Sequence, residues 1–249
     1  MKKLLGRLLG KGVSAVRPTC TAILAAAGSS QRMGGEDKLL LPLDGMPVLA
    51  HTLRAVDAAQ SVDEIVIAAR EEDLLTYAEL CKTYGIRKPV KVVVGGATRQ
   101  ESVLRAALEA RADAKLLAVQ DGARPLVTPE LFDAVVLRAA VCAAAAPAVP
   151  MHDTIKLARD RRVTETPDRS MLFAVQTPQV FDAGLLKAAL QSALTEHAAL
   201  TDDCSAVERL GKAVYLTDGD EENIKITTPL DLIVAEAILR RREEREAEK

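Results

Sequence analysis

Aromatic residues are scarce in this chain. Its 249 residues include three Phe, three Tyr and no Trp, and 33 Lys and Arg are balanced by 35 Asp and Glu, which gives a formal net charge of −2. Proteins that bind single-stranded nucleic acid use a basic groove and aromatic rings on which bases stack. The composition therefore argues against a nucleic-acid partner. It leaves open a local cluster of positive charge that binds a small anionic ligand.

Cysteine is also rare, and long apolar runs are absent. The four cysteines lie far apart and form no C-x-x-C pair, which argues against a zinc ribbon or a redox motif. We expect reduced thiols and a cytoplasmic protein. No apolar run approaches the roughly 20 residues that a membrane-spanning helix needs, so no membrane association is expected. The three histidines are scattered, and no histidine metal triad is predicted.

Residues 1–20 differ in character from the rest of the chain. They mix five basic residues with four leucines but lack the continuous apolar core of a signal peptide. A short basic amphipathic helix is one interpretation. We expect a flexible N-terminal extension.

From residue 21 onward, apolar segments alternate with amphipathic ones. The pattern predicts strands over residues 21–27, 62–68, 90–94, 116–120 and 213–217. It predicts helices over residues 47–59, 71–84, 98–111, 128–141, 182–194 and 202–210, and a final helix from Thr228. Between residues 143 and 175 the alternation gives way to short extended pieces.

Repeated β–α units predict an α/β fold, a Rossmann-like and mostly parallel sheet with helices on both faces. We expect one domain over residues 21–236, an inserted extended β-arm near residues 143–170, and a charged, solvated helix end over residues 237–249. Sheets of this kind bind ligands beyond the carboxyl ends of their strands. Residues that directly follow a strand are therefore the first candidates for a site.

The loop after the first strand has the composition of a phosphate site. Small residues around Gly28 let backbone N–H groups approach a phosphate closely, and Arg32 and Lys38 add two cations. The loop has neither the G-x-G-x-x-G spacing of a dinucleotide site nor a Walker A pattern. A nicotinamide-dependent oxidoreductase is therefore not indicated.

Eight motifs follow one another along the chain. They are A-A-A-G-S-S-x-R at 25–32, G-G-x-x-R-x-x-S at 95–102, D-G-A-R-P at 121–125, D-T-I-K at 153–156, D-R at 168–169, Q-T-P-Q at 176–179, T-D-D at 201–203 and N-I-K-I-T at 223–227. In kind and in order, these motifs resemble those of the 2-C-methyl-D-erythritol 4-phosphate cytidylyltransferase family. The resemblance extends over about residues 21–236.

The resemblance implies an activity and the residues that carry it. Members of this family transfer the cytidylyl group of CTP to 2-C-methyl-D-erythritol 4-phosphate, giving CDP-methylerythritol and pyrophosphate for isoprenoid precursors. The catalytic residues implied here are Arg32, Lys38, Arg169 and Lys225. The implied CTP-binding residues are Ala26, Ala27, Gly28, Ser29, Gly95, Arg99, Ser102 and Gly122.

The resemblance also implies how the second substrate is bound. The polyol phosphate would contact Asp121, Arg124, Thr154, Arg169 and Thr201. Asp121 would in addition hold Mg²⁺, which commonly takes one or two carboxylates together with phosphate oxygens. In this family the arginine at position 169 belongs to the arm of the partner subunit, so a homodimer is implied.

Three positions depart from the family pattern. Asp37 stands where proline is usual and places a carboxylate beside Lys38, which is expected to weaken the attraction of Lys38 for phosphate. Gly122 replaces an alanine, and His152 replaces an arginine.

Two other functions stay open. One is a cytidylyltransferase for ribitol or ribulose 5-phosphate, and the other is a non-catalytic nucleotide-binding relative. The segment Asp218-Gly219-Asp220 matches the D-x-D metal motif of glycosyltransferases, but we interpret it as a turn because of its late position in the chain.

Overall fold

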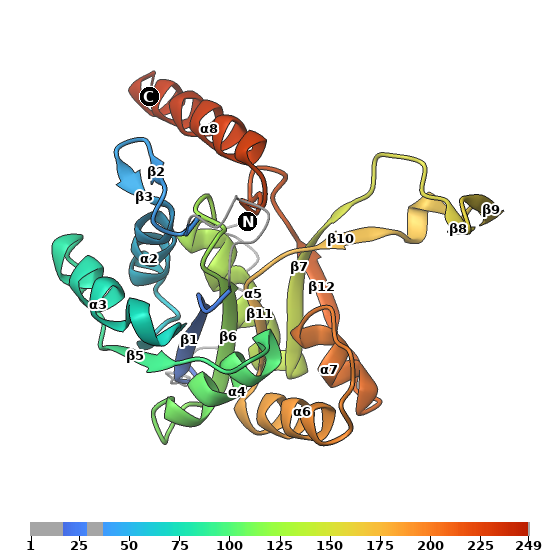
Figure 1. Cartoon of the computed structure of the whole chain (residues 1–249), viewed down its shortest axis with the longest axis horizontal. Helices are drawn as coiled ribbons and strands as arrows, with labels where there is room; N and C mark the ends of the chain where they lie inside the picture. The colour runs from blue at the N-terminus through green and yellow to red at the C-terminus, as the bar shows by residue number, and fades with distance from the viewer. Residues whose placement is uncertain (1–16, 29–36, 249) are drawn as a thin grey trace, which may run out of the picture.

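The computed structural model describes residues 17–28 and 37–248. Most of the predicted N-terminal extension lies outside these residues, as do the candidate site residues Ser29 and Arg32. Within the described residues, the fold is a central sheet flanked by helices, with one slender projection (Figure 1). The predicted α/β class is confirmed.

The central sheet has eight strands in the order β10-β7-β11-β6-β1-β4-β5, with β12 paired to β7 off this path. Strands β1, β4, β5 and β6 are mutually parallel, and β12 runs parallel to β7. Strands β10 and β11 run antiparallel to their neighbours. The strand bounds are β1 Cys20–Ala25, β4 Glu64–Ala69, β5 Val90–Val94, β6 Leu116–Asp121, β7 Ala144–Pro150, β10 Phe173–Val175, β11 Gln179–Asp182 and β12 Tyr215–Asp218.

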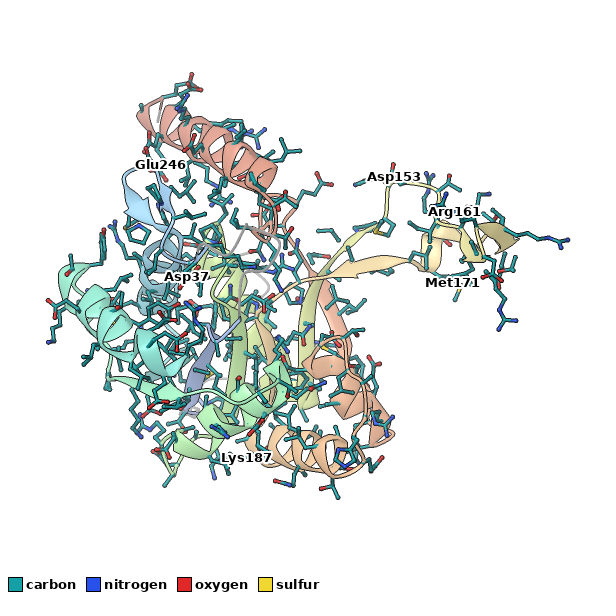
Figure 2. The ribbon with its side chains drawn as sticks, viewed as in Figure 1. Asp37, Asp153, Arg161, Met171, Lys187 and Glu246 are labelled. Atoms are coloured by element: carbon teal, nitrogen blue, oxygen red, sulfur yellow. The ribbon has the colours of Figure 1, made fainter. Side chains whose placement is uncertain are left out.

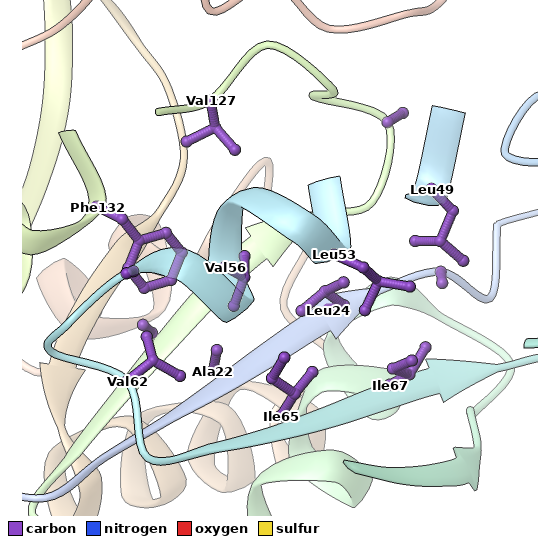
Figure 3. Packing of buried hydrophobic residues seen from close by; sticks show 14 of the residues in the cluster. Ala22, Leu24, Leu49, Leu53, Val56, Val62, Ile65, Ile67, Val127 and Phe132 are labelled. Atoms are coloured by element: carbon purple, nitrogen blue, oxygen red, sulfur yellow. The ribbon is translucent and has the colours of Figure 1, made fainter. Parts of the chain in front are cut away.

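Helices cover both faces of this sheet. Successive side chains of a strand point to opposite faces, so Ala22 and Leu24 enter one apolar cluster and Ile23 enters the other. Figure 3 shows part of the first cluster, where Leu24 lies near Leu53 of α2. The helices are α2 Val48–Ala58, α3 Leu74–Thr83, α4 Arg99–Glu109, α5 Pro129–Cys142, α6 Ala183–Thr195, α7 Asp203–Arg209 and α8 Pro229–Ala247, with the short 3-10 turns η2 Glu71–Asp73 and η3 Arg169–Met171.

Helix α4 begins where its sequence predicted. The side chain of Thr98 accepts a hydrogen bond from the backbone N–H of Glu101 at 3.1 Å, which satisfies one of the unpaired donors of the first turn. The carboxylate of Glu101 accepts from the backbone N–H of Ala97 at 2.8 Å. This cap fixes the start of α4 beside the carboxyl end of the sheet.

Two local features were not predicted. Strand β11 lies between β6 and β7 and is antiparallel to both, but its four residues are too short to show an alternation of their own. A small hairpin joins β2 Pro42–Leu43 to β3 Met46–Pro47, with Asp44 and Gly45 at positive φ between them. Asp-Gly is a common pair in such two-residue turns.

The predicted arm begins later in the chain than expected. Residues 144–150 form strand β7, and Ala144, Ala145 and Ala146 are fully buried in the main sheet, so they belong to the core and not to the arm. Small alanine side chains allow this strand to pack between helices. The arm proper spans residues 151–172 and contains the hairpin of β8 Leu157–Arg159 and β9 Arg162–Glu165. It projects away from the body of the molecule (Figure 1).

The C-terminal helix makes two specific contacts within a charged end that is mostly exposed. Helix α8 crosses the predicted boundary at residue 236 without a break, and Ile238 and Leu239 pack against the core. The Nε of Arg242 donates to Oε2 of Glu222 at 2.7 Å, and its Nη1 donates to the carbonyl oxygen of Leu126 at 3.0 Å. Residues 243–248 are exposed, as the charged pattern predicted, whereas Arg242 is half-buried because Glu222 and the carbonyl oxygen of Leu126 bind it.

None of the helices in the described part of the chain is both long enough and apolar enough to cross a membrane.

We expect Arg242→Ala to lower the free energy of unfolding by about 1–2 kcal/mol, because two partly buried acceptors lose their donor. Urea denaturation measures this change. Arg240→Ala, an exposed position on the same helix, is the control and should stay within about 0.5 kcal/mol of the parent. Equal stability of the two variants would contradict the docked helix end.

Candidate functional site

A cavity of about 320 Å³ opens at the carboxyl ends of β1 and β6, beside the start of α4. This is the edge of the sheet where a ligand site is expected. The cavity is lined by Ala25, Ala26, Ala27, Gly28, Lys38, Leu39, Gly96, Ala97, Thr98, Arg99, Ser102, Asp121, Ala123 and Lys225. The structure thus brings together predicted residues from four separated segments of the chain.

One wall of the cavity depends on a close approach of two loops. A Cβ atom on Gly95 would lie 2.7 Å from Cβ of Ala27 and 2.8 Å from Oγ of Ser102, so a side chain does not fit there. Oγ of Ser102 accepts a hydrogen bond from the backbone N–H of Gly96 at 2.9 Å and donates to the carbonyl oxygen of Thr98 at 2.8 Å. Gly95 and Ser102 therefore shape this wall, although Gly95 is not itself among the lining residues.

Asp121 is the main anionic group of the cavity and is surrounded by cations. Its Oδ2 lies 2.8 Å from Nζ of Lys225 and 3.8 Å from Nε of Arg124, and its Oδ1 lies 3.5 Å from Nη2 of Arg99. Burial would raise the pKa of Asp121, but Lys225 and Arg99 outweigh it and the pKa is lowered. Its backbone N–H donates to Oγ1 of Thr177 at 3.1 Å. Asp121 is thus held ionised.

Asp203 is a second buried carboxylate, to which the sequence analysis assigned no role. Its side chain is fully buried, and its Oδ2 lies 2.7 Å from Nη2 of Arg99. Burial raises the pKa of Asp203 despite this ion pair. The guanidinium of Arg99 therefore bridges Asp121 and Asp203. The only sequence signal was the second acidic residue of T-D-D at the start of a predicted helix.

The side chain of Gln179 connects β11 to the start of α7. Its Oε1 accepts hydrogen bonds from the backbone N–H groups of Asp203 and Cys204 at 3.0 and 3.1 Å, and its Nε2 donates to Asp202 at 2.8 Å. The unpredicted strand β11 therefore fixes the position of the buried carboxylate that binds Arg99.

The two predicted catalytic lysines inside the described residues face the same cavity. Nζ of Lys38 donates to the carbonyl oxygen of Ile226 at 3.0 Å, directly after Lys225 in the chain. The backbone N–H of Ile226 donates to the carbonyl oxygen of Ala123 at 2.8 Å. These bonds connect the segment around Lys225 to the loop after β1, through Lys38, and to the loop after β6, through Ala123.

Two predicted binding residues support the cavity from outside its lining. The guanidinium of Arg124 donates to the carbonyl oxygen of Asn223, and burial lowers the pKa of Arg124. The backbone N–H of Gly122 donates to the carbonyl oxygen of Ala25 at 3.2 Å, and its own carbonyl accepts from Thr52 at 2.9 Å. An alanine at position 122 would place Cβ 3.2 Å from Leu49, so glycine eases this packing.

Three other predicted residues lie away from the cavity lining. Thr154 and Arg169 belong to the arm, and Nη1 of Arg169 donates to the carbonyl oxygen of His152 at 2.8 Å. Figure 2 shows Asp153 and Met171 on the arm, well separated from Asp37 on the body. Thr201 is exposed and precedes α7 by two residues. The segment Asp218-Gly219-Asp220 ends β12 and lies outside the cavity lining.

A model of the 2-C-methyl-D-erythritol 4-phosphate cytidylyltransferase family matches residues 20–241. A cytidylyltransferase of that name from Bacillus cytotoxicus is 44% identical over 220 residues, which cover 88% of this chain and 97% of the relative. One from Syntrophotalea carbinolica is 43% identical over 221 residues, with 87% and 94% of the two chains covered.

Solved structures show the same similarity. The 4-diphosphocytidyl-2C-methyl-D-erythritol synthase of Anaerococcus prevotii superposes with a TM-score of 0.82 at 30% identity, covering 90% of this chain and 96% of the other. The 2-C-methyl-D-erythritol 4-phosphate cytidylyltransferase of Thermus thermophilus superposes with a TM-score of 0.71 at 31% identity, covering 88% and 98%.

The Arg99–Asp203 pair gives a prediction about stability. Asp203→Asn alone leaves the Arg99 charge unmatched on that side, and Arg99→Gln alone leaves a buried carboxylate unpaired, so each should lower the free energy of unfolding by about 2–4 kcal/mol. The double variant should lose clearly less than the sum of the two. Denaturant unfolding of all three measures this coupling.

The exposed ion pair of Arg105 with Glu101 on the same helix is the control. Arg105→Gln should change the free energy of unfolding by less than about 1 kcal/mol. Additive losses at positions 99 and 203 would show that the two residues do not act as a pair.

Proposed function

The chain belongs to the 2-C-methyl-D-erythritol 4-phosphate cytidylyltransferase family, and we propose that it transfers the cytidylyl group of CTP to 2-C-methyl-D-erythritol 4-phosphate in isoprenoid precursor synthesis. The products are CDP-methylerythritol and pyrophosphate. The observation that carries this proposal is one cavity that joins Lys38, Arg99 and Lys225 to Asp121 at the carboxyl edge of a parallel sheet.

The reaction is a substitution at phosphorus. A phosphate oxygen of the polyol phosphate attacks the α-phosphorus of CTP and forms a new P–O bond, while the bond from the α-phosphorus to the bridging oxygen breaks and pyrophosphate leaves with that electron pair. Phosphoryl transfer of this kind needs little covalent help from a protein, so catalysis consists mainly of positioning and of stabilising negative charge.

The two lysines suit the second task. Lys38 and Lys225 approach the cavity from different segments, and each ammonium is a point charge on a flexible stem. Lys225 is held 2.8 Å from Asp121 and is therefore positioned before a nucleotide arrives. We assign both to the triphosphate, with Lys225 at the α-phosphate. Arg32, outside the described residues, is assigned to the same phosphates.

Another part of the cavity wall suits the nucleoside. It is lined by Ala26, Ala27, Gly28 and the loop before α4, and it offers backbone groups and small side chains rather than an aromatic ring. We assign cytosine and ribose to this wall. Arg99 also lines the cavity, where its guanidinium is fixed between Asp121 and the buried Asp203.

The donor set at Asp121 fits a magnesium ion brought with the triphosphate. In the described part of the chain, no group of three or more His, Cys, Asp or Glu residues could hold a metal ion alone. A single carboxylate on the cavity wall, completed by phosphate oxygens and water, is a usual Mg²⁺ arrangement. There the ion would neutralise charge on the phosphates, while Asp121 would share its oxygens between the ion and Lys225.

The arm supports a dimeric site. Thr154 and Arg169 lie on the arm, away from the cavity of their own chain, and the arm exposes the apolar side chains of Leu157, Val163 and Met171. Two copies that exchange arms would bury these side chains and bring Arg169 to the partner's cavity. We propose that Arg169, Thr154 and Thr201 bind the polyol phosphate in such a homodimer, with Arg124 acting from behind.

The state of the cysteines bears on where the protein works. The four cysteines are free thiols, which supports a location in the reducing cytoplasm.

A cytidylyltransferase for ribitol or ribulose 5-phosphate would need the same nucleotide site and would differ only in the residues that bind the polyol. A non-catalytic nucleotide-binding relative is disfavoured, because Lys38, Arg99, Asp121 and Lys225 all reach the cavity.

A substrate panel tests the reaction. We expect pyrophosphate release with CTP and 2-C-methyl-D-erythritol 4-phosphate to exceed the rate with ribitol 5-phosphate, and the rate with the other nucleoside triphosphates, by at least about 10²-fold in kcat/KM. Chelation of Mg²⁺ should abolish turnover, and added Mg²⁺ should restore it. A preference for ribitol 5-phosphate would overturn the substrate, and CTP binding without turnover would overturn the activity.

Substitution of the lysines tests their roles. Lys38→Ala and Lys225→Ala should each lower kcat by about 10²–10³, as expected for the loss of one positioned cation at a developing charge. Steady-state pyrophosphate release measures the loss. Lys212→Ala is the control, because Lys212 is exposed and does not line the cavity. Turnover near the parent value in either lysine variant would remove that residue from the mechanism.

Mixed dimers test the exchange of arms. Arg169→Ala and Lys225→Ala should each be nearly inactive as homodimers. An equimolar mixture, unfolded and refolded together, should regain about a quarter of the parent activity, because each hybrid dimer has one intact cavity served by one intact arm. A mixture that stays as inactive as its components would show that each arm serves its own chain.

A further inference from the structure

The carboxylate of Asp37, beside Lys38 in the sequence, has hydrogen-bond donors elsewhere in the fold. Asp37 is outside the cavity lining, and its side chain is mostly buried against the helix α3 region. Oδ2 accepts hydrogen bonds from the hydroxyl of Tyr77 at 2.9 Å and from Nη2 of Arg70 at 3.1 Å. The carboxylate of Asp37 thus accepts from a guanidinium, which also pairs with Glu72 and Asp73, and from a buried hydroxyl.

The hydroxyl of Tyr77 is held in one position where it donates to Asp37. Its side chain is fully buried in the core on α3, where a hydroxyl needs a partner. Burial, together with the neighbouring Asp37, raises the pKa of Tyr77, so the hydroxyl stays a donor. Nε of Arg70 is itself held by Oδ2 of Asp73 at 2.5 Å. Two side chains anchored elsewhere in the fold therefore converge on one carboxylate.

The same carboxylate shapes the turn that carries Lys38. Its Oδ1 accepts from the backbone N–H of Leu39 at 3.0 Å, the side-chain turn that Asp favours. The carbonyl oxygen of Asp37 accepts from the backbone N–H of Leu40 at 2.9 Å, which closes residues 37–40 around Lys38. Leu39 is buried, and its carbonyl oxygen accepts from the backbone N–H of Leu49 at 2.9 Å. A proline at position 37 would keep the backbone carbonyl that Leu40 uses, but it would offer no side-chain acceptor to the N–H of Leu39, the hydroxyl of Tyr77 or the guanidinium of Arg70.

We propose that Asp37 is a positioning residue that, through Tyr77 and Arg70, fixes the turn over residues 37–40 and so places the ammonium of Lys38 at the triphosphate end of the cavity. The proposal rests on the assignment of Lys38 to the nucleotide phosphates. In this chain, the carboxylate of Asp37 would thus orient the neighbouring Lys38.

CTP affinity measured by calorimetry tests the proposal without requiring turnover. Tyr77→Phe, Arg70→Gln and Asp37→Asn should each weaken CTP binding by about tenfold, the effect expected from losing one hydrogen bond to a charged group. In a Lys38→Met background the same substitutions should cause no further loss, because the residue they place is gone. Tyr84→Phe, at the end of the same helix, is the matched control and should bind like the parent.

The outcomes separate this proposal from the proposed function. An equal loss of CTP affinity with and without Lys38, or no loss with Lys38 present, would overturn the role of Asp37 even if pyrophosphate is released normally. CTP binding with the expected dependence on Lys38, but without transfer to any polyol phosphate, would overturn the proposed function and leave the role of Asp37 supported. Urea unfolding of Tyr77→Phe shows whether this core substitution destabilises the fold as a whole. Arg70→Gln is the second control, because it removes a donor to the same carboxylate without altering the core.

Discussion

The ionised Asp121 is the group around which the candidate site is organised. A buried carboxylate is costly unless cations and donors surround it. Here Lys225, Arg99 and Arg124 come from three different segments and converge on its two oxygens. The electrostatic requirement of one residue therefore fixes where three cations stand before any substrate binds. Such preorganised charge is what a triphosphate needs at the moment of transfer.

The supporting contacts extend this arrangement outward into the fold. Arg99 is held from its far side by Asp203, which Gln179 of β11 positions. The loop that carries Lys225 is held by Arg124, which donates to Asn223, and by Arg242 of α8, which donates to Glu222. A chain with a net charge of −2 can thus still concentrate positive charge in one cavity. The local field rather than the total charge determines what the protein attracts.

Much of the cavity could be predicted from the sequence, because carboxyl ends of parallel strands meet at one edge. Lys38, Arg99, Ser102, Asp121 and Lys225 follow strands or begin helices, and all five line the cavity. What could not be predicted depends on tertiary packing. Strand β11 has only four residues and gains its place by pairing with β6 and β7, so the role of Asp203 stayed hidden. The arm boundary was misplaced because alanines 144–146 show no alternation of apolar and polar residues. The donors that bind Asp37 could not be predicted because they lie more than 30 positions away in the chain.

The proposed function requires that this cavity hold CTP with its phosphates between Lys38 and Lys225. A crystal structure of the protein with CTP and Mg²⁺ would show whether it does. We expect the α-phosphate within hydrogen-bonding distance of Lys225, the base against the wall formed by Gly95 and Ser102, and Asp121 beside the metal. A nucleotide bound elsewhere, or phosphates directed away from both lysines, would contradict it.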